Sequence, residues 1–160
     1  MSRTLSLEIL AEEDRLWAAG RARRFVAELG FSSLDQARLA VCIAELASNT
    51  AKHAGGGRIE LAEEELPRRG CRVRADDEGP GIACVDDALR DGFSEGRLLT
   101  PDVPLRERHG LGVGLGALGR FLRDVRVSAR PGGGLRIEAV LWREPVADNR
   151  IEEVRAWRRI

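Results

Sequence analysis

Residues 110–119 read Gly-Leu-Gly-Val-Gly-Leu-Gly-Ala-Leu-Gly, a density of glycine that is unusual for packing alone. Glycine alternates through four cycles, and the pattern then continues as a helix that includes Leu118, Phe121 and Leu122. Glycines that open a helix leave several N–H groups aimed at one point, where the helix dipole also favours anions. The stretch therefore predicts a phosphate-binding site at the start of a helix.

Two common phosphate-binding schemes do not fit this chain. Gly114 to Gly119 formally matches the dinucleotide pattern Gly-x-Gly-x-x-Gly, but it follows the polar segment Pro101 to His109, where that fold requires a strand. A P-loop requires Gly-Lys-Ser/Thr, and the single lysine of the chain, Lys52, stands between an alanine and a histidine. The predicted site is therefore of another kind.

Upstream of the glycines, Asp77-Glu78-Gly79-Pro80-Gly81 directly follows a predicted strand. Two glycines and a proline bend the chain sharply and leave little side-chain bulk near the backbone. An aspartate at a strand end can accept a hydrogen bond from an exocyclic amine such as that of adenine. A bare turn is the alternative interpretation of these residues.

Glu45 and Asn49 lie four residues apart on a predicted helix that is otherwise almost entirely apolar. They project from nearly the same side. The amide carbonyl of Asn49 suits a hard cation such as Mg²⁺, while Glu45 can accept a proton from a hydroxyl. The alternative is a polar stripe that bonds to a nearby loop.

A capping box, Ser33-Leu34-Asp35-Gln36, predicts that this helix starts near Leu34.

The other predicted elements place these motifs in an α+β domain. They are strands at 4–10, 58–63, 71–76, 125–129 and 135–142, and helices at 12–29, 34–53, 85–91 and 149–160, besides the helix after the glycines. This order predicts an α/β two-layer sandwich with helices on one face of a mixed, mainly antiparallel sheet. We expect one domain over residues 1–144 and a helical extension over 145–160.

Composition narrows the functional classes. The 160 residues are 43% apolar and 32% charged, which excludes wholesale disorder, and no run is long enough to span a membrane. Basic and acidic residues balance at 26 each, so nothing draws the whole chain to nucleic acid. The three cysteines have no Cys-x-x-Cys spacing, which disfavours zinc. Unpaired thiols, together with an N-terminal start that lacks an apolar signal-peptide core, indicate a cytoplasmic protein.

Taken together, the three motifs resemble those of the GHKL ATPases, which share the Bergerat ATP-binding fold. Glu45 to Asn49 resembles their N box, Asp77 to Gly81 their first glycine box and Gly110 to Gly116 their second. Within that superfamily the chain resembles the bacterial anti-sigma factors and switch-protein serine kinases. The RsbT-type kinases are the most similar, partly through Glu28-Leu29-Gly30-Phe31 and Asp91-Gly92-Phe93-Ser94.

The resemblance implies that the chain binds ATP or ADP with Mg²⁺. It implies that Asn49 coordinates the metal, that Asp77 holds the adenine amine, and that Glu45 is the general base. The remaining nucleotide-binding positions are Lys52, Gly79, Gly81, Ile82, Arg108, Gly110, Leu111, Gly112, Val113, Gly114 and Leu115. Lys52, one turn beyond Asn49, is the candidate phosphate contact on the helix.

The function implied is an ATP-dependent serine/threonine protein kinase of a partner-switching pathway that regulates stress responses or sigma factors. Its substrate would be a STAS-domain antagonist or a stressosome-like protein, and its second partner a PP2C-type phosphatase or a sigma factor. The C-terminal helix, with Trp157, either covers the sheet or joins two copies as a homodimer.

Two departures from the family pattern keep an alternative open. Gly134-Leu135 stands where many relatives carry Gly-Thr, so a hydroxyl near the nucleotide is missing. The segment from Ser94 to His109 is longer than expected, and we expect it to form a lid; a solvated flexible loop is the alternative interpretation. The alternative is a non-catalytic ATP/ADP-binding module that acts as an anti-sigma factor or activates a phosphatase.

Overall fold

The computed structural model describes residues 1–80, 93–94, 97–98 and 116–144. Its elements are β1 (Thr4–Ile9), α1 (Asp14–Glu28), α2 (Ser33–Ala54), β2 (Gly57–Glu64), β3 (Gly70–Asp77), β4 (Phe93–Ser94), β5 (Arg97–Leu98), α4 (Gly116–Phe121), β6 (Arg123–Ala129) and β7 (Leu135–Trp142). The helices predicted at 85–91 and 149–160 and most of the predicted lid lie outside the described residues.

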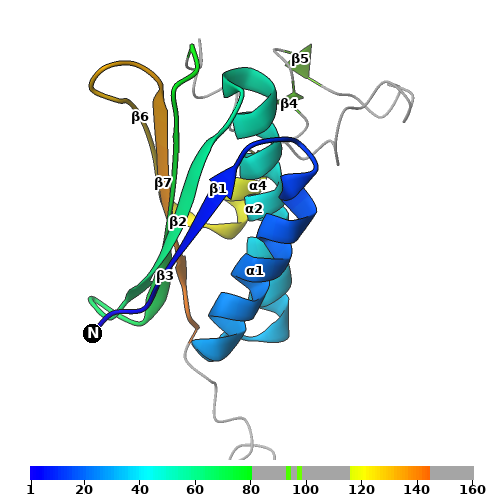
Figure 1. The fold of residues 1–160 in the computed structure, drawn as a ribbon. Helices are drawn as coiled ribbons and strands as arrows, with labels where there is room; N and C mark the ends of the chain where they lie inside the picture. The colour runs from blue at the N-terminus through cyan, green and yellow to red at the C-terminus, as the bar shows by residue number, and fades with distance from the viewer. Residues whose placement is uncertain (81–92, 95–96, 99–115, 145–160) are drawn as a thin grey trace, which may run out of the picture.

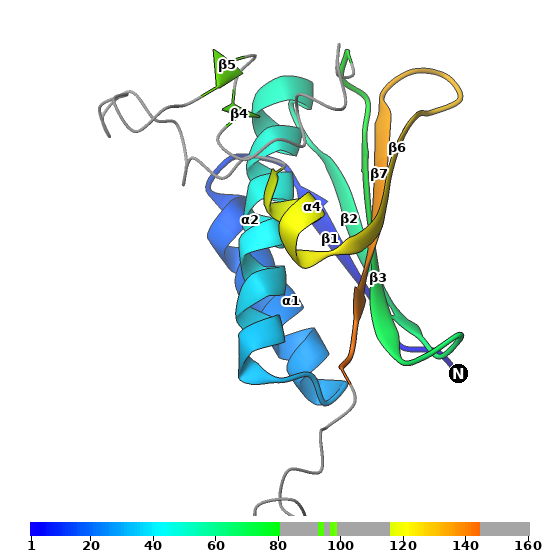
Figure 2. The same ribbon diagram turned by 180° about the vertical axis from the view of Figure 1, so that it is seen from behind.

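Five strands form one sheet in the order β1-β2-β3-β7-β6, and each neighbouring pair is antiparallel. Helices α1, α2 and α4 all lie on one face of this sheet (Figures 1 and 2). A separate two-stranded pair joins β4 and β5. The predicted α+β class, with helices on one face of a mainly antiparallel sheet, is confirmed.

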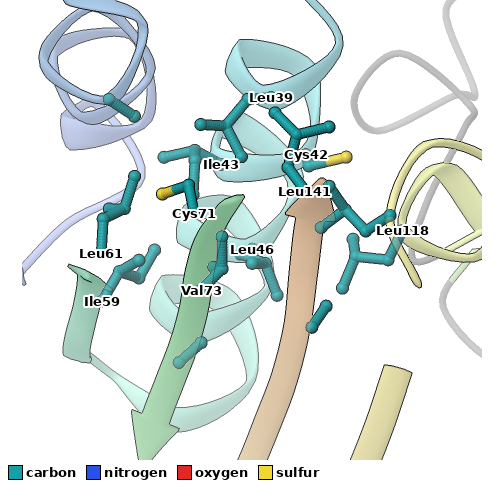
Figure 3. Close-up of a cluster of buried hydrophobic side chains, with 14 of the residues drawn as sticks. Leu39, Cys42, Ile43, Leu46, Ile59, Leu61, Cys71, Val73, Leu118 and Leu141 are labelled. Carbon is teal, nitrogen blue, oxygen red and sulfur yellow. The ribbon is translucent and has the colours of Figure 1, made fainter. Parts of the chain in front are cut away.

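The core lies between the sheet and α2, because strand residues alternate between the two faces. Ile59 and Leu61 of β2 and Val73 of β3 point inward and are fully or almost fully buried. They meet α2 at Ile43 and Leu46, as Figure 3 shows. Burial at these positions anchors α2 against the sheet and fixes which of its sides faces each neighbouring element.

The opposite face of the sheet carries charged pairs. Arg136 donates to both carboxylate oxygens of Asp76, at 2.7 and 2.9 Å, and Arg74 bonds to Glu60 on the neighbouring strand. Among the described elements, no helix covers this face. The alternation of apolar and charged residues along β2, β3 and β7 is therefore explained by one covered and one open face.

The predicted capping box of α2 is wrong by one residue. Ser32, in an extended conformation, is the N-cap, and its hydroxyl accepts a hydrogen bond from the Asp35 N–H at 3.1 Å. The side chain of Gln36 instead donates to the Phe31 carbonyl. Two consecutive serines offered the same capping chemistry, and only the backbone conformation selects between them. At the other end Gly55 adopts a left-handed conformation and ends the helix.

Candidate functional site

A polar stripe runs along the last half of α2. Glu45, Ser48, Asn49 and Lys52 stand at helical spacings of three and four, so they lie on one side of the helix. Glu45 is 8% exposed and Ser48 4% exposed, while Asn49 and Lys52 are half-buried. The structure thus brings the predicted base, metal ligand and phosphate contact onto one helix side, bordering its apolar core side.

Helix α4 packs beside this stripe. The buried thiol of Cys42, one turn before Glu45, donates to the carbonyl of Ala117 at 3.6 Å. Burial, with a smaller effect of the Glu45 carboxylate, raises the pKa of Cys42 to about 12, so the thiol is protonated at neutral pH. The helix predicted after the glycine stretch corresponds to α4, whose described part begins at Gly116.

Asp77, the last residue of β3, is held at a corner between two hairpins. Its Oδ1 accepts hydrogen bonds from the N–H groups of Gly79, at 2.9 Å, and Leu135, at 3.2 Å. Its carbonyl accepts from Arg130 at 2.7 Å. Gly134, with φ +94°, lies so close that a Cβ there would stand 1.9 Å from the Asp77 carbonyl oxygen. Two backbone N–H groups therefore hold the carboxylate, while Arg130 and Gly134 contact the backbone carbonyl of Asp77.

The same corner packs on the end of α2. A Cβ on Gly79 would lie 2.7 Å from the Cβ of Ala54 and 3.0 Å from the carbonyl oxygen of His53. Only a glycine fits between the first glycine motif and the last turn of the helix. This contact brings the Asp77 corner next to the α2 end at which the polar stripe finishes with Lys52.

Glu12 is a polar residue of the site that the sequence patterns did not indicate. It belongs to the connection between β1 and α1, and its Oε1 lies 3.2 Å from the Lys52 ammonium. The hydroxyl of Ser48 donates to the same oxygen at 3.5 Å. No spacing rule links this connection to α2, and only the fold reveals the pair.

A shallow cleft of about 480 Å³ lies nearby, at the end of the sheet. It is lined by the Gly55–Gly57 turn, by Arg58 and Arg130, and by Asp76 and Asp77, but by no residue of the polar stripe. Asp77 therefore borders both this cleft and the side of the sheet that faces α2. The polar stripe of α2 lies on the second of these sides.

The donor set on the described residues fits magnesium better than zinc. None of these residues form a cluster of three or more His, Cys, Asp or Glu side chains that could hold a metal. Asn49 supplies a single amide oxygen, which suits Mg²⁺ because that ion takes most of its ligands from phosphates and water.

In the described part of the chain, no helix is long and apolar enough to cross a membrane.

Several predicted nucleotide contacts fall where the structure gives no description. Gly81, Ile82, Arg108 and the stretch from Gly110 to Leu115 lie outside the described residues. Their part in the site, like the roles of Glu45, Asn49, Lys52, Asp77 and Gly79, stays a prediction.

Comparison with known proteins decides the family. The model for the histidine kinase-, DNA gyrase B- and HSP90-like ATPases matches residues 34–145. The chain belongs to this GHKL ATPase family. The match spans α2, the Asp77 corner and α4, so the resemblance predicted from the three motifs is confirmed.

The chain is also similar to a known protein kinase. It is 32% identical over 137 residues to the serine/threonine-protein kinase RsbT of Bacillus subtilis (strain 168). That alignment covers 85% of this chain and 94% of the relative. The GHKL domain therefore rests on residues 34–145, and the likeness to RsbT on 85% of this chain.

Proposed function

We propose that this protein is an ATP-dependent serine/threonine protein kinase of a bacterial partner-switching pathway. The similarity to the kinase RsbT over 94% of its length carries the proposal. Residues 1–144 form the kinase domain and residues 145–160 a helical extension. The protein acts in the cytoplasm, without direct contact with nucleic acid.

In this proposal ATP binds between α2 and the Asp77 corner. Asp77 accepts a hydrogen bond from the adenine amine, and Asn49 contributes to a Mg²⁺ site beside the phosphates. Bound Mg²⁺ supplies positive charge that offsets the developing charge on the phosphates. The glycines at 79, 81, 110, 112 and 114, with Ile82, Leu111, Val113, Leu115 and Arg108, complete the contacts to the nucleotide. The N box and the two glycine boxes support these roles for the residues that stand on them, whereas Ile82 follows the first glycine box and Arg108 belongs to the predicted lid.

Glu45 is the general base. A serine or threonine hydroxyl of the partner attacks the γ-phosphorus, its proton passes to the Glu45 carboxylate, and the bond to the ADP oxygen breaks. The phosphoryl group ends on the partner, and no covalent enzyme intermediate forms. Such a transfer depends mainly on positioning and electrostatics, which a base fixed on a buried helix supplies.

The substrate is a STAS-domain antagonist or a stressosome-like protein. Phosphorylation adds about −1.5 to −2 charge to the contact surface of that partner and expels it from the kinase. The released kinase then engages a second partner, either a PP2C-type phosphatase or a sigma factor.

One structural feature favours a second candidate, a module that binds ATP or ADP without transferring phosphate. Leu135, at the position where many relatives carry threonine, offers only its backbone N–H to Asp77. Nucleotide binding would then set the affinity of the protein for its partners, and Glu45 would not act as a general base.

One experiment separates these functions. The protein is incubated with Mg²⁺, labelled ATP and STAS domains from the same genome, as native chain and as Glu45→Ala. A kinase labels a STAS serine or threonine with the native chain only. Nucleotide-dependent capture of the STAS domain without label identifies the binding module. Equal labelling by both forms excludes Glu45 as the base.

A further inference from the structure

Lys52 is held by the β1–α1 connection in a way that bears on nucleotide binding. Its ammonium lies 3.2 Å from Glu12, while its side chain is 21% exposed and that of Glu12 is 44% exposed. We propose that Glu12 restrains Lys52 as a competitor of the nucleotide, and that ATP binding transfers the Lys52 ammonium from the Glu12 carboxylate to a terminal phosphate oxygen. This inference rests on the proposed function, because it assumes that ATP binds along α2.

The Asp14 side chain holds the backbone of the connection that carries Glu12. Asp14 accepts hydrogen bonds from the N–H groups of Leu10, at 2.9 Å, and Ala11, at 3.0 Å, so the connection turns tightly before α1 begins. The Glu12 side chain then reaches over α2, where it also accepts from the buried Ser48 hydroxyl. Lys52 therefore meets a carboxylate held in place by a structured turn.

The ion pair between Glu12 and Lys52 can be replaced by an ion pair between Lys52 and a phosphate. A partly exposed ion pair is weak, because water already solvates both groups, so a triphosphate with several negative charges can displace the carboxylate. After that exchange Glu12 retains Ser48, and the guanidinium of Arg15 lies 3.8 Å from it. The released carboxylate therefore keeps a hydrogen-bond donor and a positive neighbour on its own side of α2.

The inference makes a signed prediction for nucleotide affinity. Removing the Glu12 charge frees Lys52 before the nucleotide arrives, so Glu12→Gln tightens ATP binding by about threefold to tenfold. The gain is smaller for ADP, which lacks the terminal phosphate. It also falls as salt is added, because screening weakens a partly exposed charge. If Glu12 instead oriented Lys52 toward the phosphates, the same substitution would weaken ATP binding.

The test is a double-mutant cycle measured by calorimetric titration with MgATP and MgADP. The variants are Glu12→Gln, Lys52→Met and the two combined, with Glu28→Gln as control, since Glu28 pairs with Arg24 at the far end of α1. We expect a gain in ATP affinity when Lys52 is present and a change of less than twofold when it is methionine. The control should match the native chain.

Three outcomes would overturn the inference: weaker or unchanged ATP binding by Glu12→Gln, the same gain without Lys52, or the same gain for ADP and ATP. Each leaves the proposed function intact if the native chain binds MgATP. Failure of the native chain to bind MgATP rejects the proposed function together with this inference. Thermal melting of each variant separates an affinity change from a loss of folded protein.

Discussion

Asp77 and Lys52 lie at two ends of the candidate site, and they are held in opposite ways. The Asp77 carboxylate accepts from two backbone N–H groups, and Gly134 packs closely against the Asp77 backbone. The Lys52 ammonium is held by a partly exposed side chain, Glu12, from a different part of the chain. Moving Asp77 requires displacement of backbone, whereas moving Lys52 requires only rotation of side chains.

This difference in how the two side chains are held suits them to different parts of a nucleotide. A group fixed by backbone contacts suits a ligand feature that never changes, such as the adenine ring, because no ordering is required when the ligand binds. A group held by an exchangeable ion pair suits the phosphates, whose number changes during the reaction. Substitutions at each end of the site should therefore affect nucleotide binding and phosphoryl transfer separately.

The largest effect is expected at Glu45, in the polar stripe. Glu45→Gln keeps the shape of the side chain but removes the proton acceptor. Phosphoryl transfer to a STAS domain should fall by about 10²- to 10⁴-fold, the usual contribution of a general base. ATP affinity should stay within about threefold of native. Radiolabel transfer and calorimetry measure the two quantities, with Glu60→Gln on the open face of the sheet as control. A parallel loss of both would assign Glu45 to binding rather than to chemistry.

The next effect concerns the rigidity of the Asp77 corner, for which the chain offers a matched pair of glycines. Gly132 and Gly134 both have positive φ, but only a Cβ on Gly134 would meet the Asp77 backbone. Gly132→Ala should cost about 1 kcal/mol of unfolding free energy through its backbone conformation. Gly134→Ala should cost about 1–3 kcal/mol more because the corner must shift, and it should also weaken ATP binding. Equal urea midpoints for the two variants would show that the corner is soft.

A smaller effect is expected for recognition of the base. In the described part of the chain both hydrogen bonds to the Asp77 carboxylate end on Oδ1, so Asp77→Asn can keep them. The second oxygen becomes an NH₂ group, which cannot accept from the adenine amine. ATP affinity should fall by about tenfold to thirtyfold, as for a lost hydrogen bond to a charged group. GTP, with a carbonyl at the same ring position, should lose less. Equal losses for ATP and GTP would place Asp77 away from the base.

The fixed end of the site was largely predictable from sequence, and the exchangeable end was not. Asp77 follows a strand of alternating residues and precedes two glycines, and each of those signals is local. Asn49 and Lys52 follow from helical spacing. Glu12 comes from another element, and nothing in its neighbourhood indicates that the β1–α1 connection folds over α2. The one-residue error at the cap, Ser32 for Ser33, has a similar cause, since local chemistry allowed both.

The smallest effect is expected at Asp76, next to Asp77 but on the open face of the sheet. The hydrogen bonds and charge of Arg136 hold the pKa of Asp76 below its ordinary value of 3.8. A carboxylate with a lowered pKa stabilises the fold fully above that ordinary value, and the contribution is lost as the pH falls through its pKa in the folded protein. Asp76→Asn should therefore lower the melting temperature by roughly 1–4 °C at pH 7, with the difference shrinking below about pH 4. Its ATP affinity should equal that of the native chain, because the side chain points away from α2. Weaker ATP binding by Asp76→Asn, with native stability, would mean that the base lies in the cleft at the end of the sheet, and that Asp77 and Lys52 do not share one ligand.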